Sequence, residues 1–543
     1  MRKSKNRSKS PPRTVNSGYS EGGASRSRNT LKTWQPQHFS SKEDIDKNLS
    51  TLRDRAHDLA INSPVGAAAI NTMVTNVIGV GLKLFPRIKH QTLGLTPEAA
   101  RDWSRKTKEE FELWAKSALA CDFIRRNNFY ELQRIAFGSY LTEGDNFCLF
   151  RRREPTKFNP YSLRLQLIEA QRVSNPVVNG GMIAAVSNVE MKKIGSQNRI
   201  VNGIEVDREG AQVAIWISNR IWNEISTVEP ELKWQRVRWY GRDSGERNLL
   251  HICADSRPDQ FRGVPLLAPV IESLKQISRY GDAELTSAII KSFFSIFFVQ
   301  PLSNLEINSV LGADDDGKPI VDVNEYRLGP ATMAALPKGV DVKAVDSSNA
   351  QSTFDAFTGA YLKQVGSAIN IPYEVLLKNF TASYSASRAA LLQAADEFRQ
   401  RKGWFIADFC EPIYQQWLSE AVAIGRIEAP GFFDDPIKKT AWSAADWYNE
   451  QSHFLDPVKE TQAMILRLQA GLSTYSSEVA NATGQDFNEI IETLRQEREL
   501  VASLPVVVME PNQAAQQEDN EDDESDDEKR ERERLRRAQR RLP

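Results

Sequence analysis

The chain has 543 residues, which is enough for two to four domains with a substantial buried core. Its four cysteines are widely scattered, with no CxxC pair and none close to a histidine pair, so a small disulfide-stapled module is excluded. Reduced, buried thiols are expected, which suits a protein assembled in a cytoplasm. The 70 Lys and Arg nearly balance the 71 Asp and Glu, but this balance hides two strongly charged ends.

Both ends of the chain resemble polyelectrolyte tails. The first 28 residues hold eight Lys or Arg against the single acid Glu21, and the sequence predicts a basic, disordered tail over 1–45. The stretch 518–528 is a dense acidic block followed by Arg-rich sequence to 541, so a charged, disordered tail is predicted over 506–543. Such tails either keep a particle soluble or dock a nucleic acid or partner.

No segment predicts insertion into a membrane. The apolar stretch 288–299 is interrupted by Lys291 and is too short to cross a bilayer. The basic amino terminus is not followed by the apolar core of a signal peptide. We therefore expect a soluble protein that is not exported and has no membrane partner.

The amino-terminal part is predicted to be helical. Residues 62–81 begin with a Ser-Pro pair and end with glycines, the usual start and end signals of a helix. A second helix begins at Thr96 with a Thr-Pro-Glu sequence. Asn128 followed by Glu131 resembles a capping box that opens a third helix through Leu141.

From Asn146 the hydrophobic period changes from about 3.6 residues to 2, which predicts strands. The alternation in 203–217 surrounds a turn with Asp207 and Gly210, the pattern of a hairpin. Further strand candidates are 147–151, 163–168, 234–240 and 248–252. An α+β body is therefore predicted after the helices.

Two helices then bracket a turn-rich insert. The first is predicted over 270–294 and the second over 353–370, where Asn370 and Pro372 end it. A polar loop with Lys378 follows.

A very long amphipathic helix is predicted over 388–424, with a kink near Pro412. One stripe of this helix is apolar and is expected to be buried, because its members recur at multiples of three and four residues: Leu391, Ala395, Phe398, Phe405 and Phe409. Two more helices are predicted over 456–470 and 486–500.

No motif for catalysis or cofactor binding survives inspection. The sequence GADDDGKP at 312–319 resembles a phosphate-binding loop, but Pro319 stands where Ser or Thr must hold magnesium, and three consecutive aspartates would repel phosphate. The five histidines leave little material for a zinc site or a Ser-His-Asp triad, and GxSxG and HExxH are absent. His251 is expected to be a core histidine. We predict no catalytic residues, no metal, no cofactor and no enzymatic activity.

Six stretches together resemble one family, in its order and over about residues 50 to 500. They are SPVGAAAINTMVTNVIGVGLKL, CDFIRRNNFYELQRIAFGSYLTEGDNF, RPDQFRGVPLLAPVIESLKQISRYGDAELTSA, IPYEVLLKNFTASYSASRAALLQA, LDPVKETQAMILRLQAGLS and GQDFNEI. The chain resembles tailed-phage portal proteins of the lambda type, and only the two tails lie outside the likeness.

The resemblance implies a mainly helical α+β protomer and a division of the chain. A wing would span 46–262, two stem helices 263–298 and 353–371, and a clip 299–352 between them. A tunnel loop would follow at 372–387, then a long kinked helix at 388–425 and a helical crown at 426–505.

The resemblance also implies function and partners. Portal proteins form a ring, usually a dodecamer, at one capsid vertex of the virion, where DNA enters during packaging and leaves during ejection. The expected partners are further copies of the chain, double-stranded DNA, the terminase large subunit, major capsid and scaffold proteins, and head-completion or tail-connector proteins. Assembly would take place in the host cytoplasm.

Candidate site residues follow from these assignments. A conduit must pass DNA without holding it, so few phosphate contacts per subunit are expected, and none that read bases. The candidates that face DNA are Lys378, Asn379, Thr381, Ser385 and Arg388. The candidates in the clip for docking terminase or connector proteins are Asp314, Asp315, Asp316 and Lys318.

Two alternatives remain open from sequence. One is an NTP-driven motor or nuclease subunit of the packaging machine, which Pro319 and the missing acidic metal context disfavour. The other is a DNA-binding regulator whose basic tail contacts phosphates.

Overall fold

The computed structural model describes residues 19, 23–176, 189–190, 198–221, 231–292, 296–299, 341–344, 351–380, 384–449 and 457–503. The chain divides into two compact units. The first comprises Met1–Thr461 with Asn481–Gly484, and the second Gln462–Ala480 with Gln485–Pro543. The predicted tail over 506–543 and nearly all of the predicted clip lie outside the described residues, whereas residues 19 and 23–45 of the predicted tail over 1–45 are described.

Six α-helices form the described amino-terminal part of the first unit. They are α1 (Leu49–Asn62), α2 (Pro64–Val77), α3 (His90–Leu93), α4 (Pro97–Ala115), α5 (Ala118–Cys121) and α6 (Phe129–Glu143). Three of them, α2, α4 and α6, begin where their capping signals predict. The Ser63 side chain accepts a hydrogen bond from the Gly66 amide, and the Asn128 and Glu131 side chains form both halves of the capping box. Helices α1, α3 and α5 were not predicted.

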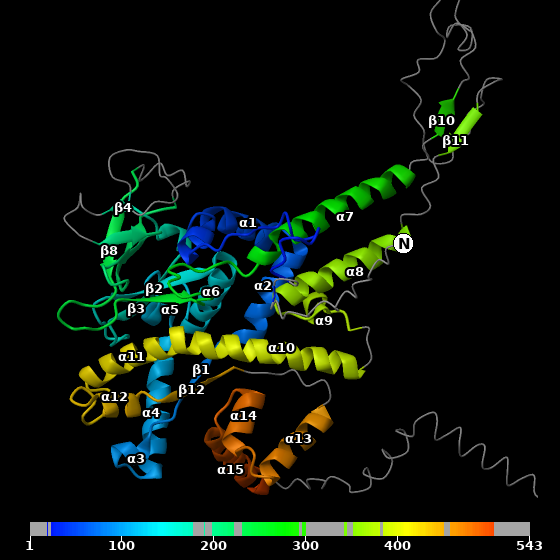
Figure 1. The fold of residues 1–543 in the computed structure, drawn as a ribbon. Helices are drawn as coiled ribbons and strands as arrows, with labels where there is room; N and C mark the ends of the chain where they lie inside the picture. The colour runs from blue at the N-terminus through cyan, green and yellow to red at the C-terminus, as the bar shows by residue number, and fades with distance from the viewer. Residues whose placement is uncertain are drawn as a thin grey trace, which may run out of the picture. The chain divides into compact units, whose positions relative to one another are not determined.

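Two antiparallel sheets form the body after α6 (Figure 1). The three-stranded sheet has the order β3-β2-β9, with β2 (Asp145–Arg152) between β3 (Leu163–Ile168) and β9 (Leu249–Cys253). The five-stranded sheet runs β4 (Val189–Glu190), β5 (Arg199–Val201), β6 (Ile204–Val206), β7 (Gln212–Ser218) and β8 (Trp234–Arg238). The predicted hairpin is β6–β7, and the prediction of an α+β body is confirmed.

Two further strand pairs join distant parts of the sequence. Strand β1 (Lys83–Pro86) pairs with β12 (Ala445–Tyr448), and β10 (Ile296–Val299) pairs with β11 (Asp341–Ala344). Strand β10 corrects the implied first stem helix over 263–298, because its last residues form a strand. The helix itself, α7, spans Ile271–Ser292 after a short 3-10 turn at Ala268–Val270.

The chain returns through helix α8 (Gln351–Ala368) and the short helix α9 (Tyr373–Leu377). The predicted long helix starts earlier than expected and is a continuous path of α10 (Tyr384–Phe405), a π-helical segment (Ile406–Cys410) and α11 (Glu411–Ala423). The interruption precedes Pro412, which cannot donate a backbone hydrogen bond to the preceding turn. Helix α12 (Pro436–Trp442) follows.

The long helix carries much of the core, as its apolar stripe predicts. Phe405 and Phe409 are fully buried, and Phe398 is nearly so. Rings from α11 meet rings from α4: the centroids of Phe111 and Trp417 lie 5.0 Å apart at an interplanar angle of 87°. Such edge-to-face packing ties the amino-terminal helices to a helix about 300 residues later in the sequence.

The segment before α1 partly corrects the predicted tail. Residues from Phe39 to Asp46 pack on the first unit: Ser41 donates to the Asp259 carbonyl at 2.8 Å, and Arg257 donates to the Phe39 carbonyl at 2.8 Å and pairs with Asp44. The tail predicted over 1–45 therefore ends earlier, because these polar contacts hold its last residues.

The second unit and its junction contain helices α13 (Pro457–Gln469), α14 (Tyr475–Thr483) and α15 (Phe487–Ser503). Within the unit, Arg467 forms two hydrogen bonds with Glu478 at 2.9 Å, and the Tyr475 and Phe487 rings stack at 5.7 Å. The two predicted carboxyl-terminal helices correspond to α13 and α15, whereas α14 was not predicted.

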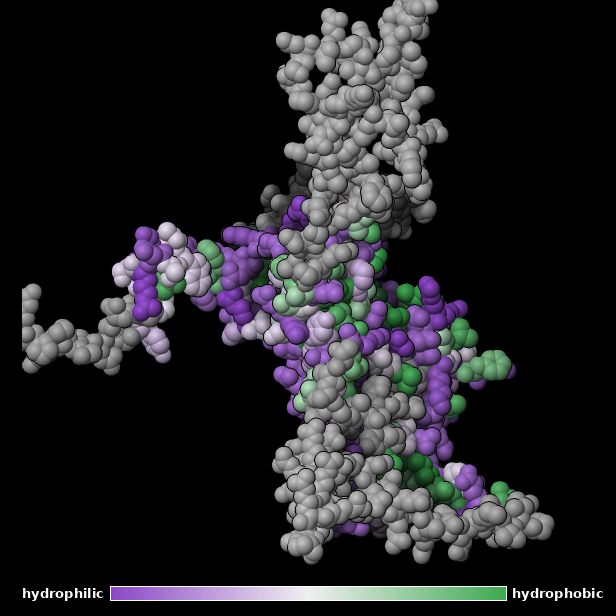
Figure 2. Space-filling model, turned by 90° about the vertical axis from the view of Figure 1, so that its right-hand side faces the viewer, coloured by the Kyte–Doolittle hydropathy of each residue, from purple (hydrophilic) through white to green (hydrophobic). Residues whose placement is uncertain are grey.

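All four cysteines are buried and free, as predicted. Among the described helices, none is long and apolar enough to cross a membrane. On the face shown in Figure 2, hydrophobic residues lie among hydrophilic ones and do not form a continuous belt.

Candidate functional site

Helices α7 and α8 lie side by side, with the chain running out along one and back along the other (Figure 1). Aromatic rings join them: the Tyr280 centroid lies 5.2 Å from those of both Phe354 and Phe357. The Tyr361 hydroxyl donates to the Gln276 side chain at 2.6 Å. These contacts make the two helices one rod of unit 1.

The turn after α8 is tightly built. The Ile371 amide donates to the Gly366 carbonyl at 2.9 Å, and a Cβ on Gly366 would come within 2.5 Å of the Ile371 carbonyl oxygen. Asn370 adopts a positive φ of 57°, as is typical of a helix terminus. The turn therefore fixes where α9 begins.

Helix α9 packs its apolar residues in the interior, and the candidate loop that follows it is exposed to solvent. Val375 and Leu376 are buried, whereas Lys378 and Asn379 are exposed. Lys378 caps the helix in the left-handed conformation, with φ 54° and ψ 35°, and its amide donates to the Glu374 carbonyl. Because the cap fixes its backbone, the Lys378 side chain leaves the surface at a defined point.

The predicted tunnel loop is shorter than its implied bounds of 372–387. Helix α9 occupies its beginning, and its end belongs to the first turn of α10. Thr381 lies outside the described residues, and for Ser385 only the position of the backbone in α10 is described. Arg388 sits in α10, partly exposed, 3.5 Å from a carboxylate oxygen of Glu460.

The structure describes two cationic candidates, Lys378 and Arg388. Arg388 is in an ion pair, whereas Lys378 makes none with another described residue. An ion pair at 3.5 Å on the surface contributes little to stability, but it partly satisfies the charge of Arg388. The clip candidates Asp314, Asp315, Asp316 and Lys318 lie outside the described residues.

A buried ionic joint holds the base of the α7–α8 rod to the body. Asp145, the first residue of β2, is fully buried and accepts from Arg53 at 2.7 Å, from Arg262 at 2.7 and 3.2 Å, and from the Gly263 amide at 3.1 Å. Burial alone would raise the pKa of Asp145, but the guanidiniums of Arg262 and Arg53 hold it well below its ordinary value.

Arg262 extends this joint to three backbone segments. Its guanidinium donates to the carbonyls of Ala170 at 2.7 Å and Val173 at 2.8 Å, and also to that of Asn202. It lies 5.3 Å from the centre of the Phe147 ring. A side chain that is 1% exposed and bonded in this way positions the start of the rod against both sheets.

Two glycines make the joint possible. Gly144 ends α6 with φ 91°, and a Cβ on Gly263 would lie 1.8 Å from the Gly144 carbonyl oxygen. The two backbones therefore cross at a distance that only glycine at both positions allows.

Asp145, His251 and Cys253 offer three ligand atoms within 4.8 Å of one another, which is the spacing of a candidate metal site. The surrounding charges oppose it. Both Asp145 oxygens already accept from arginines, His251 Nε2 lies 3.2 Å from Asp145, and burial raises the pKa of the Cys253 thiol far above its ordinary value. The donor set suits a neutral or hydrogen-bonded core better than a cation.

His251 thus has the structural role that the sequence predicts, stacked on Phe147 with centroids 4.4 Å apart. Sequence reasoning missed Asp145 and Arg262, although both stand in stretches that carry the family likeness. The adjacent glycines were the available signal, because Gly next to a charged residue between elements marks a close backbone approach.

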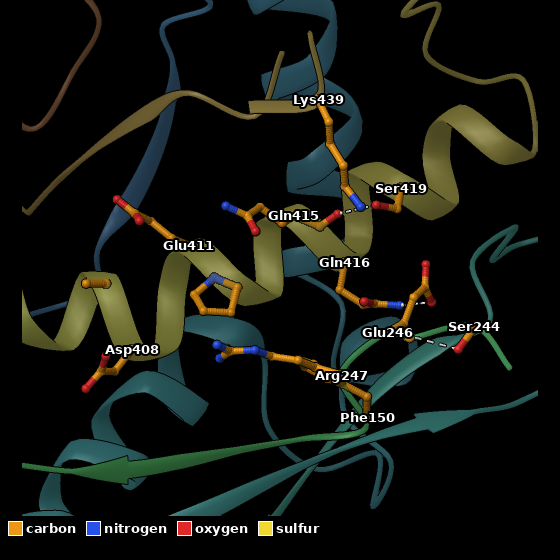
Figure 3. Close-up of a pocket in the computed structure, with 13 residues that line it drawn as sticks. Phe150, Ser244, Glu246, Arg247, Asp408, Glu411, Gln415, Gln416, Ser419 and Lys439 are labelled. Atoms are coloured by element: carbon orange, nitrogen blue, oxygen red, sulfur yellow. Dashed lines mark hydrogen bonds between the residues drawn. The ribbon is translucent and has the colours of Figure 1, made fainter. Parts of the chain in front are cut away.

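A groove of about 470 Å³ lies between the long helical path and the turn before β9 (Figure 3). Its charged lining comprises Glu246, Arg247, Asp408, Glu411 and Lys439. Gln416 holds Glu246 across the groove through a hydrogen bond of 3.0 Å. No sequence motif pointed to this groove, because its walls come from separate segments of the chain.

Comparison with known proteins decides the family. Residues 27–402 match the family model described as phage portal protein, lambda family. The chain belongs to that family. As a portal protein, it is a ring-forming structural component of the virion rather than an enzyme, and the alternative of a motor or nuclease subunit is not favoured.

Portal proteins of individual phages are similar to this chain over most of its length. The chain is 23% identical to portal protein B of Escherichia phage lambda over 492 residues, covering 87% of this chain and 88% of that protein. It is equally similar to the portal protein of Escherichia phage N15, with the same identity and coverage. Among solved structures, a chain from the neck of a native gene transfer agent particle gives a TM-score of 0.39 at 12% identity, covering 79% of this chain and 92% of that one.

Proposed function

We propose that this portal protein closes with further copies into a ring, most simply a dodecamer, at one capsid vertex. Double-stranded DNA passes through the ring during packaging and ejection, and the protein itself catalyses no reaction. The observation that carries the proposal is the presentation of Lys378: a lysine on a fixed left-handed cap, open to solvent directly after a buried anchor.

The charge of the described loop suits a conduit. Each phosphate that a protein neutralises adds affinity through the release of counterions. One lysine per subunit, followed by the uncharged Asn379, gives a weak contact that a ring repeats around a channel. Contact with the backbone alone does not depend on base sequence, as transport of a whole genome requires.

Exposure along the rod supports closure into a ring. From Gly281 to Ile289, helix α7 has no buried residue, and Leu285 is 62% exposed although it lies on the apolar side. Phe357 of α8 is 50% exposed. A protomer that leaves such side chains uncovered gains stability when neighbours cover them.

We assign the regions of the chain as follows. Residues 46–262 form the wing, α7 and α8 the stem, 299–352 the clip, the segment around Lys378 the tunnel loop, and 426–505 the crown. The clip docks the terminase large subunit during packaging and head-completion proteins afterwards, and major capsid and scaffold proteins surround the wing. Assembly takes place in the host cytoplasm.

The experiment uses purified rings and a short DNA duplex. Lys378→Gly removes the charge and suits the positive φ, so the ring should form normally in negative-stain images. We expect weaker binding of duplex and a flatter dependence of log affinity on log salt, whatever the sequence of the duplex. Lys363→Ala on α8 is the matched control.

Two results would contradict the proposal. One is a wild-type chain that never forms rings with a central hole. The other is a salt dependence that Lys378→Gly leaves unchanged while Lys363→Ala flattens it, because the DNA-facing lysine would then lie on the rod and not in the loop.

A further inference from the structure

One exposed loop of the wing is held rigid by a buried carboxylate. The loop, Asp122–Asn127, follows α5 and lies at the free edge of β3, where the Phe123 amide donates to the Leu165 carbonyl at 2.8 Å. The Asp122 side chain is buried and accepts from the amides of Ile124, Arg126 and Asn127 at 3.0, 2.9 and 3.0 Å. We call this segment the arginine loop.

The arginine loop presents an apolar side chain and two cations to solvent. Ile124 is 65% exposed, Arg125 and Arg126 are exposed, and neither arginine is in an ion pair with another described residue. Arg125 has φ 65°, a conformation that costs free energy for a residue with a side chain. Backbone strain of this kind is concentrated at functional sites, and arginine is enriched where proteins bind one another.

A complementary surface lies on the other side of the same sheet. The groove in Figure 3 is walled by the turn before β9, whereas the arginine loop is bonded to β3, and the strand order is β3-β2-β9. A second hollow of about 200 Å³ shares Arg247 and Asp408 with the groove and adds Asp255. Together the two hollows are lined by four carboxylates against the two cations Arg247 and Lys439.

Three of these carboxylates lack an ionic partner within the described part of the chain, and two of them, Asp408 and Glu411, line the larger hollow. Asp408 and Glu411 form no ion pair within the described part of the chain, in contrast to Glu246, which lies 3.8 Å from Arg152. Burial raises the pKa of both, and the negative charges of Asp255 at Asp408 and of Asp446 at Glu411 raise it further, although Arg247 partly opposes the change at Asp408. A cation that enters the groove would therefore be favoured by both carboxylates.

We propose that the arginine loop of one copy docks in this groove of the next copy, with Arg125 and Arg126 facing Asp408 and Glu411. Guanidinium and carboxylate form strong, directional hydrogen bonds, and Ile124 would add apolar contact beside them. The arginine loop and the groove lie at opposite edges of one sheet. A copy whose loop docks on one neighbour therefore still offers its groove to the other neighbour, which is the head-to-tail contact that a ring needs. The inference rests on the proposed function, since it names the contact by which the ring closes.

Charge reversal on each side tests the docking. The loop variant carries Arg125→Glu and Arg126→Glu, and the groove variant carries Asp408→Arg and Glu411→Arg. We expect each variant alone to lose at least about tenfold in the yield of rings, measured by mass photometry and negative-stain microscopy, because a tenfold loss needs only about 1.4 kcal/mol per contact. A chain with all four changes should recover rings, since the charges are exchanged and still match.

Mixing the two single-sided variants gives a result specific to this contact. The intact loop of the groove variant can meet the intact groove of the loop variant, and the altered groove and altered loop that remain carry exchanged charges that match, so the mixture should recover rings of alternating variants although neither variant forms them alone. The charge control is Arg208→Glu with Arg238→Glu, two exposed arginines on other loops and strands, which should leave the yield of rings unchanged.

Folding is checked by circular dichroism, and a milder loop variant guards against misfolding. Arg125→Gly with Arg126→Ala removes both cations and suits the positive φ, and it should lower the yield of rings in the same direction. Ring closure by both charge-reversed variants at the wild-type yield would overturn the docking and leave the proposed function standing. A wild-type chain that stays monomeric would overturn both.

Discussion

Replacing Glu143 with glutamine should make the stability of the protein less dependent on pH. Glu143 ends α6, is 7% exposed, and its carboxylate accepts from the Ala170 amide at 3.0 Å. Burial, with smaller contributions from Glu169 and Asp145, raises its pKa from 4.5 to about 7 in the folded chain, although Arg53 opposes the change.

The sign of the effect follows from proton counting. Between pH 4.5 and about 7 the folded state keeps a proton on Glu143 that the unfolded state has lost, so the free energy of unfolding falls as the pH rises. The raised pKa of Glu143 contributes to the free energy of unfolding, and this contribution is fully present below pH 4.5. By pH 8 about 3 kcal/mol of it is lost. The glutamine side chain of the variant is neutral throughout, and its carbonyl oxygen can still accept from Ala170.

The assay is urea unfolding of wild type and Glu143→Gln, followed by tryptophan fluorescence at pH 5 and pH 8. We expect near-equal stability at about pH 5 and an advantage of about 2 to 3 kcal/mol for the variant at about pH 8. Glu209→Gln, in an exposed turn, is the control and should show no such difference. An advantage of Glu143→Gln that is the same at both pH values would refute the reasoning, because it would not arise from titration of Glu143.

Two further predictions concern the buried ionic joint around Asp145. Asp145→Asn leaves Arg53 and Arg262 buried without their counter-charge and should cost about 3 to 5 kcal/mol in urea unfolding, whereas the exposed Asp243→Asn should cost little. Gly263→Ala should be strongly destabilising, because its Cβ would lie 1.8 Å from a carbonyl oxygen. The control is Gly281→Ala in the interior of α7, where a Cβ would enter open space. This control should add about 0.5 to 1 kcal/mol of stability in the same urea assay. Equal effects of the two alanines would contradict the account of the joint.

Sequence was sufficient where the stabilising contacts are local. The caps at Ser63, Thr96 and Asn128 each satisfy an amide three residues away, so a short motif determines where the helix begins. The apolar stripe of the long helix is likewise a periodic pattern within one segment. Both kinds of signal predicted the structure correctly.

Sequence was insufficient where contacts join distant segments. Strands β1 and β12 pair across about 360 residues, and each is only four residues long, so neither has a periodic pattern of its own. The joint around Asp145 draws its arginines from α1 and from the segment before α7. A single sequence does not tell which of its many charged residues will meet in the interior.

The same distinction between local and distant contacts applies to the candidate site. A polar stretch around Lys378 predicted a loop, but the left-handed cap that presents the lysine depends on how α9 ends. The arginine loop was part of a stretch noted only for its family likeness, because the role of Asp122 depends on the backbone folding around its carboxylate.

The distribution of charge separates three mechanical roles in one protomer. At the joint, Arg262 and Asp145 are fully desolvated and hydrogen-bonded on several sides, so parting them would leave a buried charge unpaired, and the rod is held firmly to the body. At the arginine loop and the groove, charges are held in place but unpaired within the copy, which favours association with a neighbour. At Lys378 the charge is single and open to solvent, so a phosphate can be met and released with little desolvation cost. In the proposed ring, which must stay closed under load while DNA slides through it, these three arrangements would serve three different purposes at three different places.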